Sequence, residues 1–323
     1  MTIREARAKA IRQLKMVPDA VGAHVNLTAT PQLDIDVILQ HVTGRSRSWL
    51  LTHDSEILTQ EETFWSMVKD RKKGLPVAYI TNSKEFFGYD FYVSQDVLIP
   101  KADTELLVEL ALEDIQENLQ KKAIGSEYRV KIADICTGTG CVAISILKKI
   151  LENKQNSSCI DCYCTDISEK ALGIARRNAN NLLPMSVLKH SRFVQGNLCE
   201  PLFKDHLTTF DYIVSNPPYV PSSITDTLLE DGRNEPRLAL DGDTSVFDIN
   251  LKQFKTTADG SGIIQLLVPQ AYELLATGGV FLIETGEYNA KKTAAQMGQA
   301  GFEDIKTFFD LSGLPRVTRG VKK

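Results

Sequence analysis

The sequence predicts an α/β protein in which a doubly wound parallel sheet follows a small helical bundle and a β-hairpin. Three observations support this. From about residue 128 onward, apolar strands alternate with helical segments. One strand, 129–136, runs into a glycine turn and then a helix. Another, 210–215, ends in Asn-Pro-Pro-Tyr, and neither a strand nor a helix continues through two prolines, which lack backbone N–H groups.

Residues 1–75 are expected to form the helical bundle. Apolar residues recur there at helical spacing: Ile3, Ala6, Ala10 and Leu14. A second helix is predicted to end at Gly44, and residues 59–62 resemble a capping box that opens a third. The histidines are isolated, which favours solvated side chains over metal ligands: His24, His41 and His53. The bundle either contacts a partner or only stabilises the chain.

Residues 76–100 are expected to form a β-hairpin linker with its turn at Gly88. Their aromatic density favours a lid or wall over a plain connection. Residues 101–323 are assigned to the sheet domain, and Asp103 or Thr104 is predicted to cap its first helix. Its further predicted strands are 159–165, 192–195, 279–285, 304–310 and 316–321, with helices at 141–151, 168–180 and 263–276.

Composition limits the classes of function. The chain has 323 residues, 43% hydrophobic and 24% charged, with a net charge of −4, which argues against a protein that coats a nucleic-acid backbone. No apolar run is long enough for a membrane span, and the N-terminus lacks the apolar core of a secretory signal. Glu5 counts against an organellar presequence, so a cytoplasmic protein is expected.

The six cysteines imply no disulfide framework. Three of them, Cys159, Cys162 and Cys164, suggest a metal site, but no histidine stands nearby to complete one. They are interpreted as small buried residues of a strand, and no metal is expected.

A cofactor site is predicted at the carboxyl ends of the first three strands. Gly138 and Gly140, between Thr137 and Thr139, allow close approach of backbone to a ligand. Asp166 ends the second strand, where a carboxylate can accept from both hydroxyls of a ribose, although it could equally cap the next helix, with Ser168 as the rival cap. Asn197 ends the third strand and is either an acceptor for an adenine amino group or a plain turn residue.

The Asn216-Pro217-Pro218-Tyr219 turn indicates the chemistry. Two prolines leave carbonyl oxygens without backbone partners, Asn216 adds a side-chain amide, and Tyr219 adds an aromatic wall. Such a turn can hold a planar –NH2 group by both hydrogens. A nicotinamide dehydrogenase could use the glycine loop, but no clear proton donor is present. The turn favours methyl transfer from S-adenosylmethionine to an –NH2 nitrogen.

The sequence resembles the HemK/PrmC family of protein-(glutamine-N5) methyltransferases along almost its whole length. The matching segments are 36–39, 42–44, 85–88, 99–105, the glycine loop, 215–219, 234–236 and 238–242. The glycine loop and the Asn-Pro-Pro-Tyr turn are shared with DNA adenine methyltransferases, whereas the hairpin, the 99–105 segment and Glu235-Pro236 are specific to this family.

The resemblance implies a class I, Rossmann-like methyltransferase sheet and methylation of the glutamine in the Gly-Gly-Gln loop of class 1 peptide chain release factors. It implies that Asn216 and the Pro217 carbonyl hold the amide hydrogens, that Tyr219 packs against the bound group, and that Pro218 completes the substrate turn. By the same resemblance the cofactor-binding residues are the glycine loop, Asp166, Asn197 and Asn216. No direct contact with nucleic acid or membrane is expected.

The chain departs from the family pattern at four positions and in one insertion. Cys136 stands where glycine is common, Lys101 where arginine is, Ala102 where proline is, and Asn197 where an acidic residue is. Residues 244–258 are interpreted as an inserted surface loop. Three alternatives stay open: a ribosomal-protein glutamine methyltransferase, an adenine-N6 nucleic-acid methyltransferase, and a cofactor-binding scaffold without catalysis.

Overall fold

The computed structural model describes residues 1–15, 30–122, 129–153, 160–205, 209–230, 234–248 and 253–323, so Cys159 and His24 lie outside the described residues. The chain forms two compact units, Met1–Ser83 with Asp226–Glu235, and Lys84–Thr225 with Pro236–Lys323. The division at residues 75 and 100 stays a prediction. No described helix combines the length and apolar character that a membrane span requires.

The first unit contains helices with a common apolar core. They are α1 (Ile3–Lys15), α2 (Pro31–Thr43), α3 (Arg47–Thr52), α4 (Glu61–Lys72) and α5 (Val77–Thr81). The predicted face of α1 is buried, and Gly44 ends α2 in the left-handed conformation, donating its N–H to the Gln40 carbonyl at 2.8 Å. The short helices α3 and α5 were not predicted, since so few residues carry little periodicity.

The predicted capping box at residues 59–62 is wrong. Gln60 precedes α4, and no side chain accepts a hydrogen bond from the first turn of that helix. The Thr59 hydroxyl donates instead to the Gln60 side chain at 2.8 Å. It therefore does not serve the backbone N–H groups at the start of α4, as a cap would.

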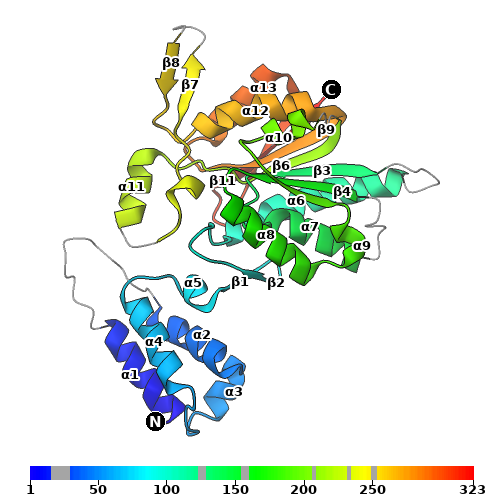
Figure 1. Ribbon diagram of the computed structural model, residues 1–323. Helices are drawn as coiled ribbons and strands as arrows, with labels where there is room; N and C mark the ends of the chain where they lie inside the picture. The colour runs from blue at the N-terminus through cyan, green and yellow to red at the C-terminus, as the bar shows by residue number, and fades with distance from the viewer. Residues whose placement is uncertain (16–29, 123–128, 154–159, 206–208, 231–233, 249–252) are drawn as a thin grey trace. The chain divides into compact units, whose positions relative to one another are not determined.

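The second unit contains a seven-stranded sheet in the order β10-β11-β9-β6-β3-β4-β5 (Figure 1). β11 is antiparallel to both its neighbours, and the remaining pairs are parallel. The strands are β3 (Val130–Ile135), β4 (Ile160–Asp166), β5 (Ser191–Gln195), β6 (Phe210–Ser215), β9 (Leu275–Glu284), β10 (Phe302–Phe309) and β11 (Pro315–Lys322). All seven predicted strands are therefore confirmed within a few residues of their predicted bounds.

Helices cover both faces of the sheet. In Figure 1, α6, α7 and α8 lie on one face and α10, α12 and α13 on the other. The central strand β6 contributes to the core on each face of the sheet. Tyr212 and Val214 belong to one buried cluster, and Phe210 and Ile213 belong to the other, as expected for a strand that is buried on both sides. The helices of this unit are α6 (Glu105–Lys122), α7 (Cys141–Glu152), α8 (Glu169–Leu182), α9 (Met185–Leu188), α10 (Glu200–Lys204), α12 (Gly262–Leu274) and α13 (Ala290–Ala300), and α11 (Ser222–Glu230) carries residues of both units.

The aromatic hairpin consists of β1 (Ser83–Phe86) and β2 (Tyr89–Tyr92), as predicted. The buried side chain of Asn178 on α8 fastens it to the glycine loop: Oδ1 accepts from the Tyr92 N–H at 2.8 Å, and Nδ2 donates to the carbonyls of Tyr92 at 3.0 Å and Thr139 at 2.9 Å. The hairpin therefore supports the predicted cofactor loop.

One prediction differs from the structure and another stays open. Asp103 and Thr104 belong to a 3-10 turn, η1 (Ala102–Thr104), directly before α6, and the Thr104 hydroxyl accepts from Asn216 Nδ2, so the cap of α6 by either residue stays a prediction. The insertion at 244–258 is not a loop throughout, because β7 (Ser245–Asp248) and β8 (Gln253–Thr256) pair as an antiparallel hairpin. Its β-branched and aromatic residues favour strand pairing. A second 3-10 turn, η3 (Arg237–Ala239), precedes it.

Candidate active site

The candidate site lies where the order of the sheet reverses. The chain leads outward from β3 to β4 and β5 in one direction, and from β6 to β9 in the other, so the carboxyl ends of β3 and β6 border a switch point, where ligands bind in such sheets. A cavity opens there. Its lining includes the predicted residues Thr137, Gly138, Thr139, Asp166, Asn197, Asn216 and Pro218. Gly140, Pro217 and Tyr219 do not line it.

The glycine loop is held by backbone bonds and by helix packing. Thr137 donates its N–H to the Thr165 carbonyl at 3.0 Å, and Gly140 donates to the Thr137 carbonyl at 2.8 Å. Gly140 has φ +79°, and a Cβ there would lie 2.8 Å from Ile144 Cδ1 and 3.3 Å from the Ala175 Cβ. Glycine at this position therefore lets α7 and α8 pack closely beneath the loop.

Asp134 is a supporting residue that the sequence did not single out. Its buried carboxylate accepts from the Thr137 hydroxyl at 2.7 Å and from the Ala143 N–H at 3.3 Å, so it joins the loop to the first turn of α7. Desolvation raises the pKa of Asp134 to about 7. The signal available in the sequence was its place at the end of an apolar strand, three residues before the hydroxyl that it binds.

Asp166 lies between the glycine loop and the start of α8. Its Oδ2 accepts from the Gly138 N–H and its Oδ1 from the Ser168 N–H, both at 2.9 Å. Ser168 caps α8, accepting from the Ala171 N–H at 3.2 Å, so Asp166 is not needed as the cap. Burial raises the pKa of Asp166, and backbone N–H groups, that of Ile167 among them, oppose this rise. An ionised carboxylate has about four lone-pair sites, so acceptor capacity remains for a ligand hydroxyl.

The outer wall of the cavity suits a flat apolar base. Ile167 lines it with half of its surface exposed, beside Leu198 and Asn197. A base placed over Ile167 would bury apolar surface that now faces solvent. This wall and the remaining acceptor capacity of Asp166 fit an adenosine-containing cofactor.

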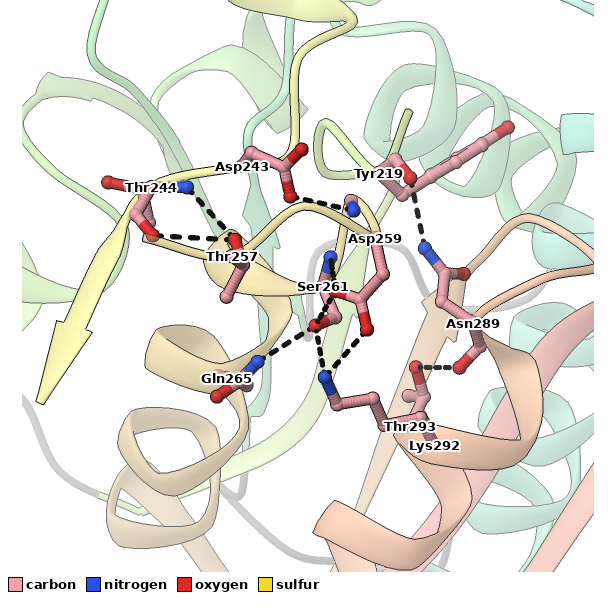
Figure 2. Close-up of polar contacts among 11 residues, drawn as sticks. Tyr219, Asp243, Thr244, Thr257, Asp259, Ser261, Gln265, Asn289, Lys292 and Thr293 are labelled. Carbon is pink, nitrogen blue, oxygen red and sulfur yellow. Dashed lines mark hydrogen bonds and ion pairs between the residues drawn. The ribbon is translucent and has the colours of Figure 1, made fainter. Parts of the chain in front are cut away.

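The Asn-Pro-Pro-Tyr turn is held from two sides. Asn216 Nδ2 donates to the hydroxyl oxygen of Thr104 at 3.1 Å, while Tyr219 donates its hydroxyl to Glu284 Oε1 at 3.0 Å. Burial raises the pKa of Tyr219 well above its ordinary value. The Tyr219 carbonyl accepts from Asn289 Nδ2 at 2.9 Å (Figure 2). The structure thus directs the Tyr219 ring toward Glu284 and not into the cavity.

Two further segments, 240–243 and 259–261, pack against the turn and the residue after it, and we call these two segments the clamp. Val220 donates to the Leu240 carbonyl and accepts from the Gly242 N–H, each at 2.9 Å. Asp243 Oδ1 joins the two segments by accepting from the Gly260 N–H at 2.7 Å (Figure 2). A Cβ on Gly260 would overlap the Tyr219 carbonyl oxygen. The clamp therefore fixes the backbone after the two prolines.

Cys136 occupies a conformation that glycine prefers, with φ +62°. We expect Cys136→Val to destabilise the protein by about 2–3 kcal/mol, because a β-branched side chain is strained there, and Cys136→Gly to cost less than about 1 kcal/mol. The matched control is Cys162, buried in strand β4. There the order should reverse, with Cys162→Val tolerated and Cys162→Gly costly. Urea denaturation measures all four; the same order at both positions would contradict the strain argument.

Cys162 and Cys164 share one face of β4, as predicted, with their sulfur atoms 4.0 Å apart. Both are buried, and within the described ranges no group of three or more His, Cys, Asp or Glu side chains is arranged to hold a metal ion.

The fold and the site define a Rossmann-like methyltransferase: a seven-stranded sheet with one reversed strand, a glycine loop after β3 and an acidic residue after β4. The PrmC N-terminal domain family matches residues 24–81, and the methyltransferase small domain family matches residues 111–234. The release factor glutamine methyltransferase of Coxiella burnetii is 33% identical over 319 residues, 98% of each chain. That of Chlorobaculum tepidum is 33% identical over 290 residues, 88% of each chain.

A solved structure, the ribosomal protein L11 methylase of Lactobacillus delbrueckii subsp. bulgaricus, covers 69% of this chain and 81% of its own at 16% identity and a TM-score of 0.41. By its full-length relatives, the chain belongs to the family of release factor glutamine methyltransferases. The predicted family membership is confirmed.

Proposed function

We propose that this enzyme transfers a methyl group from S-adenosylmethionine to the side-chain amide nitrogen of the glutamine in the Gly-Gly-Gln motif of class 1 peptide chain release factors. The observation that carries the proposal is the position of Asn216. Its Nδ2 is engaged by Thr104, and its Oδ1 has no hydrogen-bond donor among the residues that the structure describes, at a cavity that Asp166 also lines. The names of the full-length relatives support the same substrate.

S-adenosylmethionine supplies an electrophilic methyl group on a sulfonium. Asp166 would accept from its ribose hydroxyls, Asn197 would face the adenine, and the glycine loop would approach its amino-acid part. These assignments place the donor along the carboxyl ends of β3, β4 and β5, next to the turn after β6.

The chain's own residues orient the acceptor nitrogen. An amide nitrogen is a poor nucleophile because its lone pair is delocalised into the carbonyl. Asn216 Oδ1 and the Pro217 carbonyl would each accept one amide hydrogen, so the nitrogen is fixed in line with the methyl group. Alignment of this kind contributes on the order of 7–11 kcal/mol to lowering a barrier. The proton is lost after the nitrogen has gained its methyl group, when it is far more acidic.

Pro218 and Tyr219 would have different roles. Pro218 lines the cavity and would form the wall beside the bound amide. Tyr219, anchored on Glu284 and Asn289, would hold the turn in place. The helical unit would recognise the body of the release factor, and large apolar side chains are exposed on its described part: Leu33, Leu51 and Ile57.

A second candidate is methylation of an adenine amino group, which presents the same two hydrogens. A duplex-reading enzyme needs a basic surface to grip phosphates, whereas this chain carries a net charge of −4. The release factor is therefore the better substrate.

The test is a methyl-transfer assay with the full-length enzyme and purified class 1 release factor. We expect one added methyl group on the Gly-Gly-Gln peptide by mass spectrometry, and none on a release factor whose glutamine is replaced by glutamate. Duplex DNA and total ribosomal protein, incubated in parallel, should stay unmodified. Faster methylation of either one than of the release factor would refute the proposal.

A further inference from the structure

The two prolines leave the backbone of the substrate turn with few points of attachment. Pro217 and Pro218 have no N–H groups, so only carbonyl oxygens and side chains can hold this part of the chain. The first carbonyl after the prolines, that of Tyr219, accepts from Asn289 Nδ2 at 2.9 Å (Figure 2). Asn289 stands 70 residues further along the chain, directly before α13. The start of α13 is therefore bonded to the end of the turn.

The side chain of Asn289 does not serve its own helix. An asparagine at an N-cap usually accepts a hydrogen bond from the first turn of the helix, but Asn289 accepts none there. The residue is 1% exposed, and its Oδ1 has no donor among the residues that the structure describes. Burial of an amide oxygen without a partner costs free energy. Within the described ranges, the bond from Nδ2 to Tyr219 is the one hydrogen bond of this side chain, so it acts on the turn and not on α13.

Helix α13 also holds the clamp where it meets the same carbonyl. Gly260 packs against the Tyr219 carbonyl oxygen, which an added Cβ would overlap. The residues on either side of Gly260 are bound by α13, since Lys292 Nζ donates to Asp259 Oδ2 and to Ser261 Oγ, both at 2.8 Å (Figure 2). The Tyr219 carbonyl thus contacts Gly260 and Asn289, and one helix fixes the position of both.

We propose that Asn289 is a positioning residue, which fixes the peptide after the turn and thereby the direction in which the Pro217 carbonyl faces the substrate amide. The Tyr219–Val220 peptide is planar, and it is held on both sides: its N–H donates to the Leu240 carbonyl at 2.9 Å and its carbonyl accepts from Asn289. The rings of the two prolines lock their φ angles, so the Pro217 carbonyl follows the orientation of this peptide. The inference rests on the proposed function for its kinetic consequence.

The kinetic test compares variants of the full-length enzyme on the release factor. Asn289→Leu and Asn289→Asp nearly keep the volume of the side chain and remove its donor, and aspartate also suits the start of a helix, so α13 should be retained. We expect each variant to lower kcat about tenfold or more, because a small displacement of an orienting group is costly. The KM for S-adenosylmethionine should change less than about threefold.

Asn118→Leu is the matched control. Asn118 on α6 donates through Nδ2 to the Tyr212 hydroxyl at 3.0 Å, a long-range bond of the same kind that ends in the first half of β6 and not at the turn. Its loss should lower the urea midpoint and leave kcat within about twofold of the parent, at a temperature where every variant is folded. A loss of kcat in the control as large as in the Asn289 variants, or a parental kcat in those variants, would overturn the proposal.

A second measurement does not depend on turnover. The dipeptide Tyr-Val occurs twice in the chain, as Tyr92–Val93 and Tyr219–Val220. Protein labelled with carbon-13 at the tyrosine carbonyl and nitrogen-15 in valine therefore gives two carbonyl signals by NMR, and Tyr92→Phe identifies them. Both carbonyls accept from an asparagine, that of Tyr92 from Asn178 Nδ2 at 3.0 Å. We expect Asn289→Leu to shift the Tyr219 signal and to leave the Tyr92 signal in place.

The two measurements separate this inference from the proposed function. An unmoved Tyr219 signal, or equal shifts of both signals, would overturn the role of Asn289 even if the release factor is methylated. If the parent enzyme does not methylate the release factor, the proposed function fails. A Tyr219 signal that shifts alone would then still support Asn289 as the residue that fixes the turn.

Discussion

Asn216→Ala is expected to lower kcat by about 100- to 1000-fold, the range found when one preorganised group is removed from a reaction centre. By the proposed mechanism, the variant would lose the side-chain acceptor that fixes one amide hydrogen, while the Pro217 carbonyl would still hold the other. It also releases Thr104 from its bond to Nδ2. Because the glycine loop and Asp166 are unchanged, the affinity for S-adenosylmethionine, measured by calorimetry, should fall far less than kcat does.

Asn197→Ala provides the contrast. Asn197 lines the same cavity and follows β5, which is three strands away from β6 in the sheet. Its removal should raise the KM for S-adenosylmethionine and leave kcat at saturating cofactor nearly unchanged, because the lost contact holds the cofactor equally in the ground and transition states. Equal losses of kcat in the two variants would mean that Asn216 has no special part in orienting the amide.

Gly260→Ala is expected to destabilise the protein by more than about 3 kcal/mol and to reduce methylation strongly. Gly260 has φ +70°, and an added Cβ would overlap the Tyr219 carbonyl oxygen, a backbone atom that Asn289 also holds. The clamp can relieve this overlap only by moving the substrate turn. Urea denaturation measures the loss of stability, and the release factor assay measures the loss of activity.

Gly313→Ala is the matched control for that variant. Gly313 has a similar φ of +77°, but nothing lies within 4 Å of the position that its Cβ would occupy. Its substitution should therefore cost only the left-handed conformation, about 1–2 kcal/mol, with activity retained. If both alanine variants lose the same stability and keep the same activity, the clamp does not press on the turn.

The strands could be predicted, and so could the Asn-Pro-Pro-Tyr turn and Asp166 of the site, because each is marked by a local pattern in the sequence. A buried strand such as Phe210–Ser215 is a continuous apolar run, and its end is marked by two prolines. Asp166 was found in the same way, as the acidic residue at the end of a strand pattern. The seven-stranded sheet follows from the alternation of such runs with helical segments.

The hydrogen bonds that hold the site residues in place could not be predicted, because the bonded residues are far apart in the sequence. Thr104 and Asn216 are 112 residues apart, and Tyr219 and Glu284 are 65 apart. Thr104 resembled a helix cap in the sequence, and its hydrogen bond with Asn216 has no local signal. The pairing of β7 with β8 was missed because the 244–258 segment was judged against a family pattern that lacks it.

The β7–β8 hairpin begins just after one clamp segment, at Ser245, and ends shortly before the other, at Thr256. Its two ends are bridged at the base, where Thr257 donates its N–H to the Thr244 carbonyl at 3.1 Å. The Thr257 hydroxyl accepts from the Thr244 N–H at 3.2 Å and donates to the Thr244 carbonyl at 3.3 Å (Figure 2). Residues added or deleted beyond this bridge need not disturb the catalytic turn. An epitope or a fluorescent reporter inserted between β7 and β8 is therefore expected to leave methyl transfer unchanged.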